Sequence, residues 1–264
     1  MTDALVSTGV TTGSVLLVHP DAIVAAQFPV MSNAERIDLL IEAIESAIGP
    51  QGTLVIPTFN YSFTEGHPFD ICCTSSAVGM VSERFRSQPG VARTSDPIFS
   101  FACRGPVAEE LCALPVKECF GSESVFAALH RLNAKIIDLG CSMSHGGTFV
   151  HYVETAHGVN YRYPKVFSGK TISITGQSRN CSVVYHVRDL SRRSDADLER
   201  LQRRLLREDK LKIARVGRSR ILAVDAKDLF DLTRSTSARP SLSTLTRRGG
   251  AGRVWASENI RNYP

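Results

Sequence analysis

A histidine and a glutamate stand three residues apart in the stretch 146-GGTFVHYVETAHG-158. If this stretch begins a helix, His151 and Glu154 lie on the same face, one turn apart. Imidazole titrates closest to neutral pH, so His151 could act as a general base, and a carboxylate on its other ring nitrogen would fix its tautomer. By itself, however, the HxxE pattern is common, and a surface pair without function is the simpler explanation.

Two other kinds of chemistry use neighbouring residues. A metal-dependent hydrolase could be built on His145, His151, Glu154 and His157, but these spacings do not make the HExxH motif. His151 and His157 are six residues apart and would lie on nearly opposed helix faces. Cys141 could be an acylated nucleophile if a base activated it, although a small buried cysteine is the commoner case.

Composition limits the class of protein. The 264 residues are 43% hydrophobic and 22% charged, which fits a globular chain, and the seven cysteines have neither framework nor zinc-site spacing. No apolar run reaches the roughly 18 residues of a membrane span, and the first residues lack signal-peptide features. We therefore expect a cytoplasmic protein. The net charge of +5 includes a basic stretch from Arg234 onward, without the interleaved aromatics or motif of a nucleic-acid binder.

Strand-like and helix-like segments alternate along the chain. VLLVH at 15–19 and TLVIPTF at 53–59 read as strands, with a helix capped by Asn33 between them, and later segments continue the alternation. The pattern predicts an α/β fold with one domain over residues 1–234. Periodicity ends near Ser235, so 235–264 is expected to be a basic tail that is disordered in part. It contains RRGGAG at 247–252, which resembles a pyrophosphate loop but lacks the strand and helix that such a loop needs.

Five segments in the same order resemble the aminoglycoside 3-N-acetyltransferase family. They are the early VLLVH run, IEAIESAIGPQGTLVIPTFNYSF, RTSDPIFSFACRGPVAEEL, GSESVFAALHRLNAKIIDLG and GGTFVHYVETAHGVNYRYPK, together covering about residues 13 to 190. The resemblance implies a three-layer α/β/α fold with a mixed central sheet. It also implies acyl transfer from acetyl-CoA, or another acyl-CoA, to the amine of a sugar-like acceptor, with no metal.

The resemblance makes His151 the general base, since the family helix carries a histidine there in the pattern T-x-x-H-x-x-E. The acid that orients the histidine is left open between two residues. Glu154 lies one turn along the helix, whereas the antibiotic-modifying members are thought to use a glutamate some thirty residues later. In that region this chain has VYHVRDL, where Asp189 is the nearest carboxylate.

Other family positions imply contacts with the two substrates. For the donor, His19 is retained, but the serines that usually follow it in the family are replaced. Ser100 lies in a loop that is near the acyl-donor site in the family. Ser122 or Ser124 stands at the start of a helix that could bind a phosphate of the donor. An ordinary helix cap explains those last two serines almost as well. Asp96 replaces a family histidine and could bind the acceptor or simply form an Asx turn.

Two acceptors remain open within this function. Aminoglycosides are polycations, and the chain is basic, with Arg162 and Lys165 just beyond the histidine; these observations slightly favour a nucleotide-linked amino sugar. An aminoglycoside, acetylated in antibiotic resistance, is the alternative. A metal-dependent hydrolase is the alternative of another class. We expect a small-molecule acceptor as partner, no nucleic acid and no membrane, and leave open a homodimer.

Overall fold

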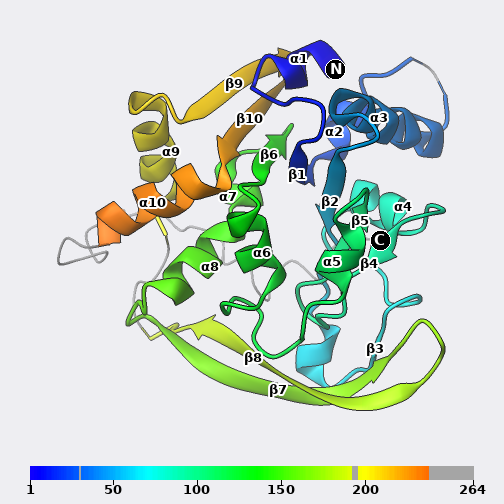
Figure 1. Ribbon diagram of the computed structural model, residues 1–264, viewed down its shortest axis with the longest axis vertical. Helices are drawn as coiled ribbons and strands as arrows, with labels where there is room; N and C mark the ends of the chain where they lie inside the picture. The colour runs from blue at the N-terminus through cyan, green and yellow to red at the C-terminus, as the bar shows by residue number, and fades with distance from the viewer. Residues whose placement is uncertain (30, 192–195, 238–264) are drawn as a thin grey trace.

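A seven-stranded mixed sheet forms the centre of the molecule in a computed structural model that describes residues 1–29, 31–191 and 196–237 (Figure 1). Its middle strands, β1, β2 and β6, run parallel, and their outer neighbours pair antiparallel. In spatial order the strands are β4 (Ala92–Arg93), β5 (Phe101–Arg104), β2 (Thr53–Pro57), β1 (Val15–Pro20), β6 (Lys135–Leu139), β10 (Ser219–Asp225) and β9 (Leu211–Val216). The predicted mixed sheet is confirmed.

Helices cover both faces of this sheet. Its strands carry apolar side chains on both faces, so each face must be shielded from water. One face packs on α1 (Thr2–Val6), α2 (Ala22–Ala25), α3 (Asn33–Ile48) and α4 (Met80–Arg86). The other packs on α5 (Ala108–Cys112), α6 (Val125–Arg131), α7 (Met143–Gly146), α8 (Phe149–Ala156), α9 (Leu198–Arg207) and α10 (Ala226–Ser237). These are the three layers expected of a single α/β domain.

Helix α3 shows how local sequence sets an element's ends. The cap is Ser32 rather than the predicted Asn33: its hydroxyl accepts from the Glu35 backbone N–H, and the Glu35 carboxylate accepts from the Ser32 N–H in return. Gly49 ends the helix with a φ of 62°, in a region that glycine adopts without steric cost. The sequence therefore places the helix correctly and misses its cap by one residue.

A second, three-stranded sheet lies beside the first and was not predicted. It pairs β3 (Phe69–Asp70) with β7 (Arg162–Ile172), which forms a long ribbon with β8 (Ser178–Arg188). The ribbon curves along one side of the molecule, past α8 and the short 3₁₀ helix η1 (Ser62–Glu65) (Figure 1). On its outer strand, β8, Val184 accepts a hydrogen bond from the Cys119 N–H and donates one to the Lys117 carbonyl. The segment around Cys119 is thereby fixed next to the ribbon.

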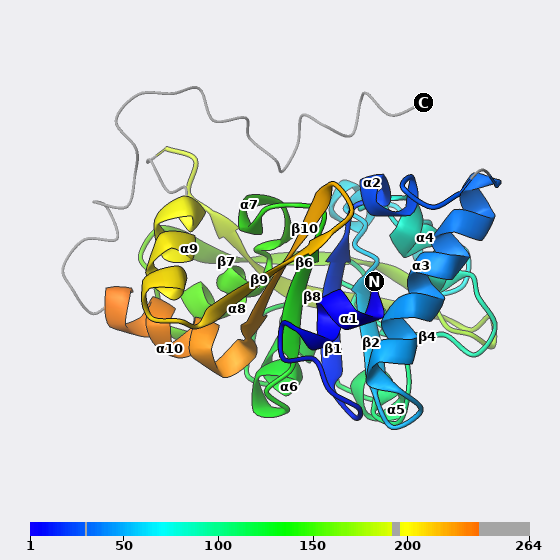
Figure 2. The same cartoon turned by 90° about the horizontal axis from the view of Figure 1, so that it is seen from above.

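The carboxyl ends of β1 and β6 meet where the sheet order changes direction. From β1 the chain continues to β2 on one side and returns to β6 on the other, and all three strands run the same way. Such switch points are where open α/β sheets bind ligands. Figure 2 shows α2, α7 and the turn between β9 and β10 gathered at this edge.

The end of the described chain differs from the predicted domain boundary. Helix α10 continues to Ser237, and Leu232 and Thr233 are buried, so the regular structure runs past residue 234. The rest of the predicted tail, including the RRGGAG segment, lies outside the described residues. Among the helices that the structure describes, none is long and apolar enough to cross a membrane.

Candidate active site

Helix α8 positions His151 and Glu154. Its apolar side chains Phe149, Val150 and Val153 are buried, and they fix the helix against the core. Two glycines precede it, and at Gly146 an added Cβ would overlap the side chain of Asp138 and crowd the ring of His19. The close approach that only glycine allows here sets α7 and α8 directly against the ends of β1 and β6.

The His151 imidazole contacts the Glu154 carboxylate, with 3.1 Å between Nδ1 and Oε2. Glu154 is almost fully buried, with 3% of its side chain exposed, whereas 31% of His151 remains exposed. The Phe120 ring packs edge-on against the imidazole, with centroids 5.7 Å apart. The ring is thus held at Nδ1 and packed by Phe120, and no described residue hydrogen-bonds Nε2, which leaves that nitrogen for a reacting group.

Two further residues hold Glu154. The Tyr161 hydroxyl donates to Oε1 at 2.8 Å, and Arg162 Nε donates to Oε2 at 2.6 Å. Burial by itself would raise the pKa of Glu154, but the hydrogen bond and charge of His151, with the charge of Arg162, lower it to about 2. Glu154 is therefore a carboxylate at neutral pH, fixed from both of its oxygens.

The same surroundings act on the histidine. Burial of its inner side and the charge of Arg162 lower the pKa of His151, and the contact with Glu154 opposes them in part. A neutral imidazole at pH 7 can accept a proton. Arg162 Nη2 also lies 2.7 Å from Nδ1, so this nitrogen has both a carboxylate and a guanidinium as neighbours.

The geometry distinguishes the two candidate orienting acids. Glu154 contacts the His151 ring, whereas the Asp189 carboxylate accepts hydrogen bonds from the backbone N–H and hydroxyl of Ser191, at 3.0 and 2.6 Å. Asp189 caps the end of the ribbon in this way. Glu154 is the acid that the structure brings to the ring.

Arg162 differs from its predicted role at the acceptor. Only 6% of its side chain is exposed, and its guanidinium is used by Glu154, His151 and the carbonyl of His186. It follows helix α8 as part of β7, and the antiparallel pairing with β8 turns it inward. The sequence did not predict the contact of Arg162 with Glu154 and His151, because the start of β7 was not recognised as a strand.

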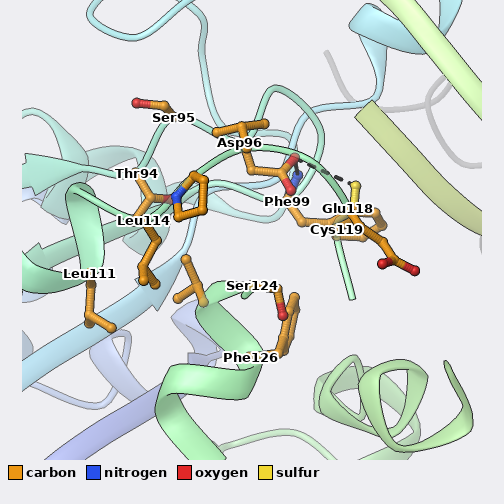
Figure 3. A pocket seen from close by; sticks show the side chains of 13 residues that line it. Thr94, Ser95, Asp96, Phe99, Leu111, Leu114, Glu118, Cys119, Ser124 and Phe126 are labelled. Atoms are coloured by element: carbon orange, nitrogen blue, oxygen red, sulfur yellow. Dashed lines mark hydrogen bonds between the residues drawn. The ribbon is translucent and has the colours of Figure 1, made fainter. Parts of the chain in front are cut away.

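A pocket opens between two loops and the start of α6 (Figure 3). Phe120 lies beside it and packs against the lining residues Phe99 and Phe126. Asp96 lies on one side, where its carboxylate accepts from the backbone N–H groups of Ile98 and Phe99, so the predicted Asx turn is present. Burial raises the pKa of Asp96, and these two donors oppose it. Glu118 lies on the other side, with its Oε1 2.6 Å from His186 Nε2. Two carboxylates therefore border one pocket.

The predicted donor-binding serines have different surroundings. Ser100 is fully buried; its hydroxyl donates to the Thr58 carbonyl and accepts from Arg93 Nε. Ser124 caps α6, accepting from the Ala127 N–H and donating to the Gly121 carbonyl. Ser122 is exposed. The hydroxyls of Ser100 and Ser124 are thus occupied within the protein.

His19 lies at the end of β1 beside Asp138 of β6. Their closest atoms, Nδ1 and Oδ1, are 3.2 Å apart but poorly aligned, and in the described part of the chain neither ring nitrogen has a hydrogen-bond partner. Asp138 was not singled out from the sequence. A lone aspartate in the apolar run KIIDLG was the signal that could have found it.

The alternative chemistries find little support in the geometry. Cys141 donates to the His19 carbonyl, and burial raises its pKa to about 12, so its thiol is a poor nucleophile. His157 contacts the Val153 carbonyl and the Phe230 ring, away from His151. Within the described residues no group of three or more histidine, cysteine or acidic side chains is placed to hold a metal ion. The His145 side chain lies outside what is described.

Comparison with known proteins now decides the family. The sequence model described as aminoglycoside 3-N-acetyltransferase matches residues 23–237, which is most of the chain. The chain belongs to the aminoglycoside 3-N-acetyltransferase family.

Relatives within this family agree with that assignment. The aminoglycoside N(3)-acetyltransferase IV of Salmonella sp is 34% identical over 165 residues, covering 61% of this chain and 59% of that protein. The type III enzyme of Enterobacter cloacae is 29% identical over 173 residues, 58% of each chain. The chain thus spans just under three fifths of the length of the curated relatives that it matches.

Solved structures of the family share the fold. The apoenzyme of aminoglycoside acetyltransferase AAC(3)-IVa superposes with a TM-score of 0.70 at 25% identity, over 90% of this chain and 87% of that one. AAC-IIIb, solved as a binary complex with CoASH, gives 0.78 at 18% identity, over 89% and 93%. At that identity the second likeness concerns the fold.

Proposed function

We propose that this protein transfers an acetyl group from acetyl-CoA to an amine of an aminoglycoside. The observation that carries the proposal is the His151–Glu154 pair, 3.1 Å apart, in a member of this family, with Nε2 hydrogen-bonded by no described residue. Membership supplies the donor class, and the named relatives supply the acceptor class.

The proposed reaction needs one general base. His151 Nε2 takes the proton that the amine must lose, and the amine nitrogen forms a bond with the thioester carbonyl carbon. The carbon–sulfur bond then breaks, and the proton passes from the imidazolium to the leaving thiolate. Glu154 stabilises the imidazolium and holds the ring, and Arg162 and Tyr161 in turn hold Glu154. No metal takes part in this scheme.

An aminoglycoside now fits better than the nucleotide-linked amino sugar that the sequence slightly favoured. That preference depended on the net positive charge, on Lys165 and on Arg162; Lys165 is exposed, but Arg162 is buried against Glu154 and so is not exposed for a diphosphate. The pocket beside Phe120 is bordered instead by Asp96 and Glu118. Carboxylates suit a polycationic acceptor, and an ammonium near Asp96 would offset the effect of its burial.

The donor is proposed to enter at the switch point, near His19. The carboxyl ends of β1 and β6 form that edge, and α7 and α8 lead from it to His151. Exposed Ser122 stays a proposed donor contact, while Ser100 and Ser124 would act through the loop and helix that they stabilise.

A thiol-release assay tests this function. Purified protein is incubated with acetyl-CoA and a panel of aminoglycosides and nucleotide-linked amino sugars, and the free thiol is measured. We expect release with at least one aminoglycoside, and a loss of turnover of about 10²- to 10⁴-fold in His151→Ala. His67→Ala is the matched control, because His67 is exposed and lies in the loop after η1.

Two results would contradict the proposal. Release with a nucleotide-linked amino sugar and with no aminoglycoside would restore the other acceptor. Near-full activity of a normally folded His151→Ala protein would show that the helix is only a scaffold.

A further inference from the structure

Two arginines face each other across the β9–β10 hairpin. Arg215 pairs directly with Arg220 in the strand register, both are exposed, and Arg218 stands in the turn between them. Like charges directly opposite on paired strands are destabilising. Lys212 on the same hairpin has an acidic partner in Asp209, but within the described residues no carboxylate pairs with any of the three arginines. An anionic ligand would relieve this repulsion.

The arginine pair lies on the face of the sheet that carries helix α8. Side chains two residues apart on a strand share a face, so Arg220 shares its face with Leu222. Leu222 pairs with Asp138, which pairs with His19. The Gly140 N–H also donates to the Arg220 carbonyl. The two arginines therefore lie on the same face of the sheet as His19 and Asp138, two residues further along β10 and β9 toward the turn.

The turn of the hairpin is fixed in place by one side chain. Gln27, just after α2, accepts from the Arg218 N–H at 2.6 Å and donates to the Ser219 hydroxyl at 2.8 Å. Gly217 has a φ of 55° in this two-residue turn and approaches Gln27 too closely for a side chain. As Figure 2 shows, the turn thus lies at the same edge as α2 and α7. The arginine cluster is presented from a fixed position.

We propose that Arg215 and Arg220, with Arg218, bind the phosphate groups of the acyl-CoA donor. This inference rests on the proposed function and names a subsite for its donor. A guanidinium matches phosphate oxygens with two parallel hydrogen bonds, and two guanidiniums on opposed strands can share one phosphate group. The rest of the donor would then follow α7 toward His151.

Charge separates the two substrates. The arginine cluster repels a polycationic aminoglycoside, whereas Asp96 and Glu118 at the pocket beside Phe120 repel phosphate. Each substrate therefore has one region of opposite charge, and the donor is the one that carries phosphates. This argument assigns the cluster to the donor rather than to the acceptor.

Calorimetric titration with CoA tests the subsite. We expect Arg215→Gln and Arg220→Gln each to weaken CoA binding about tenfold, the usual effect of losing one charge-assisted contact. Arg179→Gln is the matched control, since Arg179 is an exposed arginine on the β8 ribbon and should bind CoA normally. Titration with 3′-dephospho-CoA separates the phosphates: if the variants bind it as well as the unsubstituted protein does, the cluster holds the 3′-phosphate, and if they remain weakened, it holds the diphosphate.

Thermal melting without ligand gives a second, independent measurement. If the arginines bind a ligand and do not stabilise the fold, replacing one of them relieves the repulsion between them. The melting temperature of the variant without ligand should then not fall, although its affinity for CoA does. Unchanged CoA affinity in both variants would overturn the subsite and leave the proposed function intact. Absence of both CoA binding and thiol release in the unsubstituted protein would overturn the proposed function, and the subsite with it. Tighter, arginine-dependent binding of UDP than of CoA would overturn the assignment to the donor.

Discussion

Replacing Glu154 by glutamine tests the pairing at the centre of the site. Glutamine has nearly the same shape as glutamate but carries no charge, so it does not stabilise an imidazolium, and its amide can present either its oxygen or its NH2 group to Nδ1. The carboxylate lies 3.1 Å from Nδ1 and is 3% exposed, so little solvent can replace it. The variant should therefore fold with the helix in place and lose rate.

The size of the effect follows from the carboxylate's surroundings. Its pKa of about 2, against an ordinary 4.5, corresponds to roughly 3 kcal/mol of net stabilisation of the charged form, at about 1.4 kcal/mol per pKa unit. His151, Arg162 and Tyr161 share that stabilisation. If His151 accounts for about half of it, about 1.5 kcal/mol, turnover should fall roughly tenfold, which is less than for loss of the histidine itself.

The pH profile gives a sign as well as a size. Burial and Arg162 lower the pKa of His151, and Glu154 raises it. A base works only when deprotonated, so Glu154→Gln should move the acid limb of kcat/KM to lower pH. Arg162→Gln removes a lowering charge, so it should move the limb to higher pH.

The assay is the thiol-release rate between pH 5 and 9 for each variant, with circular dichroism to confirm folding. Tyr161→Phe is the control, because it removes one hydrogen bond to Glu154 and no charge. If the acid limb moved in the same direction in Glu154→Gln and Arg162→Gln, or stayed fixed in both, the electrostatic reasoning would be refuted.

Three further outcomes follow from the same contacts. The pKa of Glu154 in the folded protein lies below its unfolded value, so its contribution to stability is present above about pH 4.5 and should be lost as pH falls toward 2. Acid unfolding of Glu154→Gln, compared with that of the unsubstituted protein, measures this loss. Gly146→Ala should cost about 1–3 kcal/mol of unfolding free energy and lower activity, since its Cβ overlaps Asp138; unchanged melting and rate would show that α7 can move aside. Cys141 should react with iodoacetamide at pH 8 far more slowly than exposed Cys72, and Cys141→Ser should keep its activity; a thousandfold loss would favour the acyl-cysteine route.

The central sheet could be predicted because each of its strands follows local rules. Apolar runs such as VLLVH and KIIDLG read as buried strands, and the helix between β1 and β2 has clear start and stop signals. The ribbon was harder to predict. Tyr163 and Val166 of β7 are both exposed although they point to opposite faces, and Pro164 and Lys165 between them are exposed too, so no alternation marks the strand. Pairing with β8, rather than its own sequence pattern, makes the start of β7 a strand.

The contacts of the candidate site also differ in whether local sequence predicts them. His151 and Glu154 are one helical turn apart, so spacing alone placed them together. Arg162 is eight residues from Glu154, and its inward direction depends on the register of β7 with β8. Asp138 meets His19 across 119 positions of sequence through the parallel pairing of β1 and β6. Contacts of this kind need the tertiary structure.

The position of Arg162 gives Glu154 a second task. A guanidinium can only donate, so its contact with Nδ1 at 2.7 Å requires the proton to be on Nε2, and that tautomer cannot accept a proton from an amine. Contact with the Glu154 carboxylate requires the opposite tautomer, with the proton on Nδ1. Arg162 Nε is 2.6 Å from the same carboxylate oxygen, so the residue that secures Glu154 also competes with it for the ring. In Glu154→Gln the contact with Arg162 should therefore favour the wrong tautomer, which adds to the rate lost with the charge, while the shift of the acid limb reports the lost charge alone.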